Sequence, residues 1–490
     1  MSSNSHLVYS AVPPPSTETS APLTAHMADG SSIRSRQSVP ADAPAIPGVG
    51  TTAQDDRPSF RSGRRAWVRA FIRRHRPQRP VGDAPTAWRS IMAVVTSSYI
   101  NILLIFIPVS WAMHFANMSD TLIFVFSFLA IIPLAKLLAF ATDELSLRVG
   151  QTLAGLLNAT LIIALTQCKL RIVQSSLVGS ILSNLLLVLG MCFFAGGTRF
   201  SEQGFGISAT QLNSSLLTVS VIGVLLPAAF HMAVTPDTST ETDPLTNAEE
   251  RADLLKLSHG VAIVLLFIYG SYLVFQLFSH KNLYEDDHPN VQKSVAYNRH
   301  PERKESVADV EARAQEKEQE EEKPQMSVTV TVALLVIVTV LVAVTAEFLV
   351  DSIDGLTAKG AVSEEFVGLI LLPIVGNAAE HVTAVTVSVK DKLTLSLGVA
   401  VGSSIQIALF VIPFIVTLAW MMGKPLTLLF DPYESIVLFL AVLTVNYIVQ
   451  DGKSNWLEGM ILMCLYVIVA ITFWFYPGSQ QNAFIYTSCS

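Results

Sequence analysis

Charged residues are scarce in this chain, and long apolar runs take their place. Only 14% of the 490 residues are charged, whereas 51% are hydrophobic, and the mean hydropathy is +0.48. A soluble domain of ordinary composition carries roughly a quarter charged residues. The composition therefore excludes a single soluble domain and predicts a protein embedded in a membrane.

Cysteine is also rare, and its spacing forms no motif. The four cysteines, Cys168, Cys192, Cys464 and Cys489, show no CxxC spacing, and three of them lie in or beside apolar stretches. Zinc sites and disulfide-stapled folds are recognised by closely spaced cysteines. We therefore predict neither a zinc site nor a disulfide framework.

The first ninety residues lack an apolar run long enough for the core of a signal peptide. They are rich in Ser, Pro, Ala and Thr, which is typical of disorder, and we interpret residues 1–90 as a disordered cytosolic tail. An arginine cluster at residues 61–79 precedes the first apolar run and would hold the N-terminus in the cytosol. Contact with anionic lipid explains this cluster better than a nucleic-acid patch, because a membrane span follows directly.

Apolar runs close to the length that crosses a bilayer recur about eleven times. With a cytosolic N-terminus, alternation places the loop 279–326 in the cytosol and the C-terminal tail 477–490 on the opposite side. The basic residues of the loop agree with this orientation, whereas Lys169 and Arg171 count against it. The spans are expected at residues 97–115, 121–141, 150–168, 174–196, 209–234, 257–278, 327–350, 365–389, 393–421, 433–450 and 455–476.

The loop 279–326 ends in an acidic run at residues 305–324. It contains strong helix formers, has hardly any apolar face, and stops at Pro324. The plain interpretation is a solvated acidic helix. The alternative is a regulatory cation sensor, since clustered carboxylates bind hard cations. The residues that would form this sensor are Glu316, Glu318, Glu320, Glu321 and Glu322.

An internal repeat joins residues 177–190 to residues 400–413, which align over fourteen positions without a gap. The aligned pairs are Gly179 with Gly402, Ser180 with Ser403, Ser183 with Gln406, and Asn184 with Ile407. Small residues alone would indicate close helix packing, but this does not explain an asparagine or a glutamine within an apolar span. Small and polar residues at matching positions of two halves are typical of secondary transporters, whose substrate lies between the repeats.

A second polar stretch, PIVGNAAEHVTAVTVSV, precedes the second copy of the repeat. Pro373 and Gly376 weaken the helix there, so that backbone carbonyls could turn toward an ion. Asn377 and Glu380 are three residues apart and share a helix face, where an amide oxygen and a carboxylate can bind one hard cation. We expect Glu380 to be buried, and a buried ionised glutamate must pair, bind an ion or take up a proton. A permanently protonated structural glutamate is the alternative.

Two further residues lie near this stretch. His381 is about 100° round the helix from Glu380, and we expect it to be a neighbour of the ion and not a ligand. Glu347 is a candidate buried acid on the seventh span, with an interfacial charge as the alternative. The predicted cation ligands and polar lining of the site are Gly376, Asn377, Glu380, Ser403, Ser404, Gln406, Ser180, Ser183 and Asn184.

Four segments carry a family resemblance: ATDELSLRVGQTLAGLLNAT (141–160), RIVQSSLVGSILSNLLLVLGMCFFAGG (171–197), TAEFLVDSI (345–353) and GNAAEHVTAV (376–385). Over about residues 85–476 the chain resembles the vacuolar calcium/proton exchangers of fungi and plants, members of the calcium/cation antiporter superfamily. The resemblance implies an all-α membrane protein of about 11 transmembrane helices. One N-terminal helix and an inverted five-helix repeat would occupy residues 91–278, and the second repeat would occupy residues 327–476.

The same resemblance implies a secondary transporter and not an enzyme. Such a protein exports cytosolic Ca²⁺ into the vacuole in exchange for protons, and it needs no cofactor. We therefore expect Ca²⁺ and protons as its substrates and a lipid bilayer as its environment. An acidic helix between the repeats belongs to the family pattern, which favours a regulatory role for residues 305–324. The sequence does not determine an oligomeric state or the choice between calcium and manganese.

The first repeat departs from the family pattern, in which each repeat contributes one GNA-x-E helix and the two glutamates face each other across the ion. Here the second repeat runs through GNAAE, whereas the first passes from LLNAT (156–160) directly into LIIALTQ (161–167). About nine residues are absent near Leu161, which removes about 13 Å of helix. Asn158 occupies a neighbouring family position and is not the lost asparagine.

The missing glutamate leaves a divalent cation opposed by one carboxylate, so calcium should bind much more weakly. Three hypotheses follow. The gap is a gene-model or splice error and the family function holds; or the protein is a transport-impaired or regulatory relative; or it exchanges another cation, such as a monovalent ion that suits one carboxylate.

Overall fold

The structure is a computed structural model that describes residues 86–96, 99–149, 164–234, 248–284, 291–297, 326–358 and 362–478. The chain divides into two units, residues 1–65 and 66–490, and every described residue belongs to the second. The predicted N-terminal tail up to residue 85, the third span up to residue 163 and the acidic run lie outside the described residues. The missing GNA-x-E motif falls in the same undescribed part of the third span.

Ten of the predicted spans have a helical counterpart in the described part of the chain. Seven helices there are long and apolar enough to cross a membrane, one further span is broken in its middle, and two shorter apolar helices accompany them. The total of eleven stays a prediction. The first half contains α2 (Ala87–Thr96), η1 (Tyr99–Ile105), α3 (Phe106–Phe115), α4 (Asp120–Val149), α6 (Leu170–Leu182), η3 (Ser183–Val188), α7 (Leu189–Gly197), α8 (Ile207–Val234), α9 (Ala248–Val274), η5 (Phe275–Ser279) and η6 (Lys281–Tyr284).

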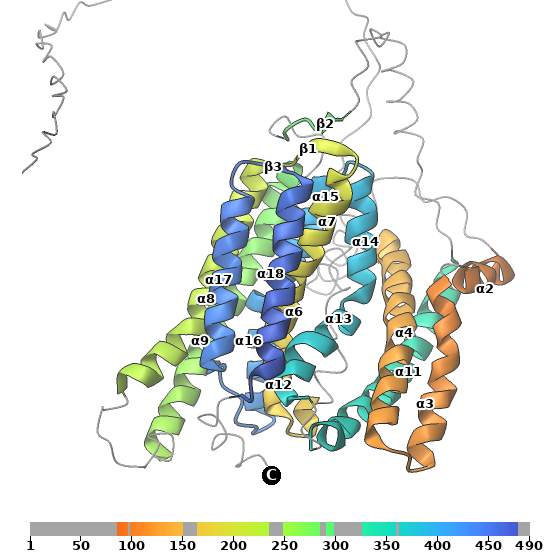
Figure 1. The fold of residues 1–490 in the computed structure, drawn as a ribbon, viewed down its shortest axis with the longest axis vertical. Helices are drawn as coiled ribbons and strands as arrows, with labels where there is room; N and C mark the ends of the chain where they lie inside the picture. Colours follow the sequence, from red (N-terminus) through yellow and green to blue (C-terminus); the bar gives the residue numbers. More distant parts are fainter. Residues whose placement is uncertain are drawn as a thin grey trace, which may run out of the picture. The chain divides into compact units, whose positions relative to one another are not determined.

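The second half contains the broken span and the second copy of the repeat (Figure 1). Its helices are α11 (Val328–Thr357), α12 (Glu364–Phe366), η7 (Val367–Leu371), α13 (Leu372–Gly376), α14 (Ala378–Val389), α15 (Leu393–Gln406), η8 (Ile407–Val411), α16 (Ile412–Met421), α17 (Pro432–Ile448) and α18 (Trp456–Phe475). The described residues are therefore mostly helical, as the sequence predicts.

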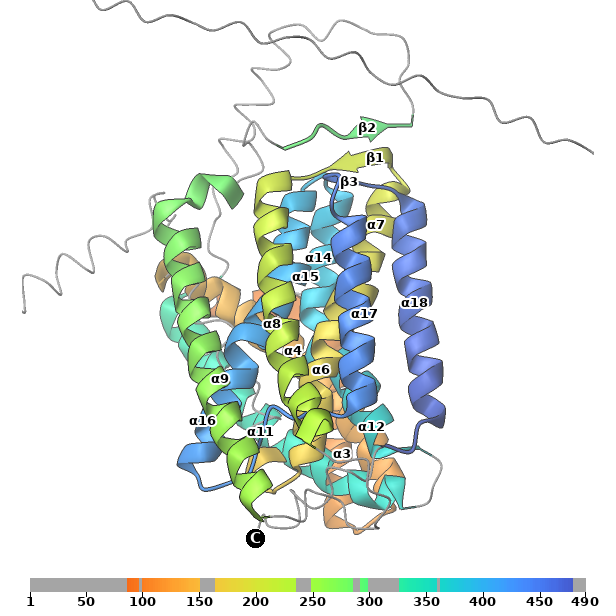
Figure 2. The same ribbon diagram turned by 90° about the vertical axis from the view of Figure 1, so that its left-hand side faces the viewer.

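Three very short strands, which the sequence did not predict, lie at one end of the helices. β1 (Phe200–Gly204) pairs antiparallel with β2 (Val295–Ala296) and with β3 (Lys453–Ser454), giving the order β2-β1-β3. They join the loop between α7 and α8, the loop after η6, and the loop between α17 and α18 (Figures 1 and 2). We call this the sheet end.

The opposite end, called here the Tyr476 end, carries two ion pairs. Lys169 pairs with Asp354, and Arg171 pairs with Glu365. The two cations that count against the predicted orientation are thus each neutralised by an acid. α17 runs from this end to the sheet end, so the loop with β2 and the residues after α18 lie at opposite ends, as the alternation of spans predicts.

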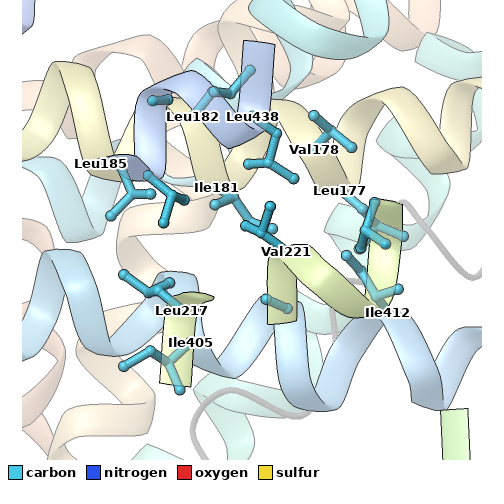
Figure 3. Packing of buried hydrophobic residues seen from close by; sticks show 14 of the residues in the cluster. Leu177, Val178, Ile181, Leu182, Leu185, Leu217, Val221, Ile405, Ile412 and Leu438 are labelled. Atoms are coloured by element: carbon cyan, nitrogen blue, oxygen red, sulfur yellow. The ribbon is translucent and has the colours of Figure 1, made fainter. Parts of the chain in front are cut away.

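The span α6–η3–α7 is central to the structure. Of its most apolar window 83% is buried, against 11% for the span that contains α9. Figure 3 shows its side chains Leu177, Ile181 and Leu185 packed among residues of α8, α15, α16 and α17. Lipid tails are as apolar as leucine, so close packing and internal polar contacts hold such a bundle together more than removal from water does.

The internal repeat is visible in the local structure. The aligned residues form a π-helical stretch in each copy, at Ser183–Val188 in η3 and at Ile407–Val411 in η8. α6 leads to α7 at the sheet end, whereas α15 begins at the sheet end and α16 ends at the opposite one (Figures 1 and 2). The two copies therefore run in opposite directions, which confirms the predicted inverted repeat.

A second group of helices consists of α3, α4 and α11. α4 packs along α11, and the backbone N–H of Met326, just before α11, donates to Oε2 of Glu144 near the end of α4. α3 is joined to this pair by the bond from Trp111 Nε1 to Thr345 Oγ1, 3.2 Å. Polar contacts thus fix the register of these helices.

One cysteine departs from the sequence-based prediction. Cys168 is disulfide-bonded, whereas Cys192 and Cys464 are free. Spacing along the chain did not predict this bond, because a disulfide depends on the distance between two Cα atoms in space.

Gly179 and Gly402 occupy equivalent repeat positions but have different surroundings. A Cβ atom added at Gly179 would lie 2.1 Å from the carbonyl oxygen of Leu369, so α6 and η7 approach each other backbone to backbone. A Cβ atom added at Gly402 would meet nothing within 4 Å in the described structure. Only the first-repeat glycine is therefore required for packing.

We expect Gly179→Ala to destabilise the protein by about 1–3 kcal/mol, the usual cost of overpacking a tight site. Gly402→Ala serves as the matched control and should leave stability unchanged or slightly raise it, since alanine favours helix. Thermal unfolding midpoints of the purified proteins in detergent measure both. Equal effects of the two substitutions would contradict the packing difference.

Candidate cation site

The broken span positions the predicted site. α13 ends at Gly376 and α14 begins at Ala378, and the two limbs of the span are bent by 57°. Asn377 between them has φ −100° and ψ 5°, in the sparsely populated bridge region. Pro373 lies in the first turn of α13. The prediction that Pro373 and Gly376 weaken this helix is confirmed.

α14 turns a narrow polar stripe toward the interior. Asn377, His381, Ala384 and Ser388 follow one another at helical spacing, and all four are buried. Ser388 Oγ donates to the carbonyl oxygen of Cys192 in α7 at 2.6 Å. The stripe therefore faces α6–η3–α7, and it carries the side chain of Asn377 into the bundle.

Two hydrogen bonds cross between the repeats at this point. Nδ2 of Asn377, in the second repeat, donates to Oγ of Ser183 in the first at 3.3 Å. Nδ2 of Asn184, in the first repeat, donates to Oγ of Ser403 in the second at 2.9 Å. Each amide nitrogen is engaged by a hydroxyl, and each amide retains Oδ1, an oxygen of the kind that hard cations bind.

The structure thus brings Asn377, Ser183, Asn184 and Ser403 together, and Ser183 Oγ in turn donates to the carbonyl oxygen of Ser180 at 3.1 Å. The other predicted lining residues are placed differently: Ser404 Oγ donates within its own helix to Ala400, Gln406 is half-buried, and Gly376 is exposed. The role of all these residues as ligands stays a prediction.

Glu380 lies on the first turn of α14 and is exposed, so the prediction of a buried carboxylate is wrong for this structure. The helix geometry gives the reason, since Glu380 stands about 60° from Asn377, at the edge of the buried stripe. A carboxylate in a first turn is stabilised by the amide dipoles of the helix. Glu380 therefore flanks the crossed bonds from the N-terminus of α14.

Glu347 is exposed as well, and the prediction of a buried acid there is also wrong. The neighbours Ala346, Leu349 and Ile353 form the packed face of α11, and Glu347 lies off that face. His381, in contrast, is buried, and its Nε2 has no hydrogen-bond partner in the described part of the chain. Its role as a neighbour of the ion is untested.

The described residues contain no group of three or more His, Cys, Asp or Glu side chains that could hold a metal ion. The oxygen atoms near Asn377 belong to amides and hydroxyls, and Glu380 follows Asn377 by three residues on α14. Oxygen donors of this kind suit a hard cation, and few charges among them give weak binding.

A family comparison agrees with the repeat and the broken span. Residues 119–278 and 330–475 match the sodium/calcium exchanger protein family. The chain belongs to this family. A vacuolar calcium ion transporter of Cryptococcus neoformans is 53% identical over 472 residues, covering 82% of this chain and 78% of that protein. A vacuolar calcium ion transporter of Schizosaccharomyces pombe is 42% identical over 394 residues, covering 79% and 87%.

Solved exchanger structures share the fold. The structure of native YfkE superposes with a TM-score of 0.59 at 30% identity and covers 77% of this chain and 100% of that one. An H⁺/Ca²⁺ exchanger CAX gives a TM-score of 0.53 at 12% identity, with 82% and 92% covered, and shows the fold alone. The exchanger fold and the inverted repeat thus rest on independent observations.

Sequence reasoning missed a group of buried charges at the Tyr476 end of this exchanger. Glu365 and Glu434 are both almost fully buried there, and Asp431 caps the N-terminus of α17. The dipeptide Asp431-Pro432 before an apolar run is a recognisable helix start. Nothing in the local sequence indicated that Glu434 packs against α6.

We expect Asn184→Asp to strengthen calcium binding, because it adds a second carboxylate next to Ser403 without changing the size of the side chain. A tenfold gain in affinity, about 1.4 kcal/mol, is the expected scale. The rise in thermal midpoint on adding calcium measures it. Asn446→Asp, at a half-buried asparagine bonded to Ser214 and Thr218 on α8, is the control. Equal behaviour of both variants would contradict the site.

Proposed function

We propose that the chain is a calcium/proton antiporter that moves cytosolic Ca²⁺ into the vacuole in exchange for protons. The names of its relatives support this substrate pair, including a Ca²⁺/H⁺ antiporter of Synechocystis that is 42% identical over 386 residues. The observation that carries the proposal is the pair of crossed bonds between Asn377 and Ser183 and between Asn184 and Ser403, beside Glu380.

In the proposed mechanism Ca²⁺ is held by the Glu380 carboxylate, by Oδ1 of Asn377 and Asn184, and by the hydroxyls of Ser183 and Ser403. The Glu380 carboxylate can bind a proton or coordinate Ca²⁺, and binding of either one weakens binding of the other. Binding of one ion therefore displaces the other, and this competition couples the two gradients.

Alternating access follows from the arrangement of the crossed bonds. They join the two repeats at one level, and each originates next to a break in regular α-helix, at Asn377 or in the π-helical stretch η3. Such irregular stretches are common at functional sites because they allow a local change of twist. Sliding of one repeat against the other would exchange the partners of these bonds and open the site to one side at a time.

We propose that the sheet end faces the cytosol and that the acidic run 305–324 regulates transport there. The arginine cluster at residues 61–79 supports this orientation through the positive-inside rule. Ser294, which precedes β2 in the same loop as the acidic run, donates to Oδ1 of Asp391 at 2.7 Å, directly after α14. The loop is therefore attached next to the helix that carries Glu380.

A second candidate function is a transport-impaired or regulatory relative, and it rests on the absence of the first-repeat GNA-x-E motif from the sequence. Glu144 is fixed at the start of α11 by Met326, and Lys169 is fixed near its end by Asp354. These contacts place the two described ends of the gap at opposite ends of α11.

Glu380→Gln should abolish cation/proton exchange, because it removes the one carboxylate of the proposed site. Calcium uptake into vesicles with an acidic interior measures this. Glu202→Gln at the sheet end removes an exposed acid that pairs with Lys453 and should transport normally. Uptake by Glu380→Gln at the level of the unmodified chain would refute the site.

Restoring about nine residues with the GNA-x-E pattern after Thr160 should raise calcium uptake at least tenfold over the chain as written, since it adds the second carboxylate of the family pattern. Equal uptake would rule out the impaired relative. Sequencing the transcript around Thr160 then separates a gene-model error from a true deletion, and competition by sodium or potassium tests a change of selectivity.

A further inference from the structure

Three buried acids, a buried serine and two half-buried side chains, an arginine and a tyrosine, come from four segments to the Tyr476 end, away from the crossed bonds. The segments are α6, α12, the start of α17 and the residue after α18. We call the group the Glu434 cluster, and its members are Arg171, Ser175, Glu365, Asp431, Glu434 and Tyr476.

Each carboxylate of the cluster has a different set of partners. Asp431 accepts the backbone N–H groups of Tyr433 and Glu434 at 2.8 and 3.4 Å, and the hydroxyl of Tyr476 at 3.0 Å. Glu365 is paired with Arg171. Within the described residues Glu434 accepts one hydrogen bond, from Ser175 Oγ at 2.5 Å, although it is only 1% exposed.

Among the described residues of the cluster, the charges do not balance when all three acids are ionised. The charges that act on Glu434 are those of Asp431, Glu365 and Arg171, so one guanidinium faces three carboxylates. Tyr476 adds no charge, because burial and then the charge of Asp431 raise the pKa of its hydroxyl. Burying an uncompensated charge is costly unless the group is neutralised.

Glu434 is the acid of the cluster whose negative charge has the fewest stabilising partners. The N-terminus of α17 would favour a carboxylate, but Asp431 already receives the first free N–H groups of that helix. The Arg171 guanidinium is engaged by Glu365. In the part of the chain that the structure describes, the Ser175 hydroxyl remains for Glu434, and this hydroxyl can donate to a carboxylate or accept from a protonated acid.

Water can approach the cluster through a cavity of about 640 Å³ at the Tyr476 end. Arg171, Glu365 and Tyr476 line it, together with Asp354 and Phe475, which are both largely exposed. The cavity therefore opens onto the Arg171–Glu365 pair, whose charges act on Glu434.

We infer that Glu434 is a second proton-binding site of this exchanger, separate from Glu380 and loaded from the Tyr476 end. This inference rests on the proposed function only because it takes protons to be the exchanged ion. Two helices connect the Glu434 cluster to both halves of the cation site. Ser175 lies on α6, about 13 Å of helix before Asn184, and Glu365 lies at the start of the broken span that carries Asn377.

Infrared spectroscopy of the purified full chain tests this inference through the carbonyl stretch of a protonated carboxylic acid. We expect such a band at neutral pH that disappears on alkalinisation, that is absent in Glu434→Gln, and that moves on transfer to D₂O within the mixing time. Glu364→Gln is the matched control, since Glu364 neighbours Glu365 and lines the same cavity, and it should keep the band.

Ser175→Ala provides a second variant that retains the acid and removes its hydrogen bond, so the band should shift in frequency without loss. A band that is unchanged in both Glu434→Gln and Ser175→Ala would overturn the site, and a band that does not respond to D₂O would overturn its access from the cavity. The spectrum needs no transport activity. Calcium uptake by the unmodified chain decides the proposed function separately.

Discussion

Polar groups inside a bilayer must find their partners within the protein, and this constraint organises the exchanger around α6–η3–α7. This span is the most buried of the described helices that could cross a membrane, and polar contacts join it to other helices along its whole length. Ser175 binds Glu434 at one end, Ser183 and Asn184 bind the second repeat in the middle, and the Cys192 carbonyl receives Ser388 near the sheet end. The remaining helices are placed relative to this one.

Much of the architecture could be predicted from sequence, because membrane spans and a repeated Gly-Ser motif are strong local signals. The internal repeat and the break near Gly376 followed from residue type and spacing, which also placed Asn377 and Ser183 in one predicted site, whereas the inversion of the repeat was implied by the family resemblance. Burial did not. Glu380 and Glu347 were expected inside because both lie in apolar stretches, but exposure depends on which helix face has a neighbour, and one sequence does not reveal that.

The Glu434 cluster was missed for a related reason. Its members come from residues 171 to 476, and each looks ordinary in its own segment: a basic residue after a loop, an acid at a helix start, a tyrosine at a helix end. Their significance arises only where four segments converge. The disulfide at Cys168 belongs to the same class of feature, since spatial proximity creates it and sequence spacing does not show it.

The break at Asn377 has a mechanical consequence. The amide of Asn377 still donates to Pro373 O at 3.0 Å, and the amide of His381 still donates to Asn377 O at 3.0 Å, so backbone pairing continues on both sides of the 57° bend. A change in the tilt of α14 relative to α13 would turn about Asn377, so the amide of Asn377 would move least and the far end of α14 would move furthest.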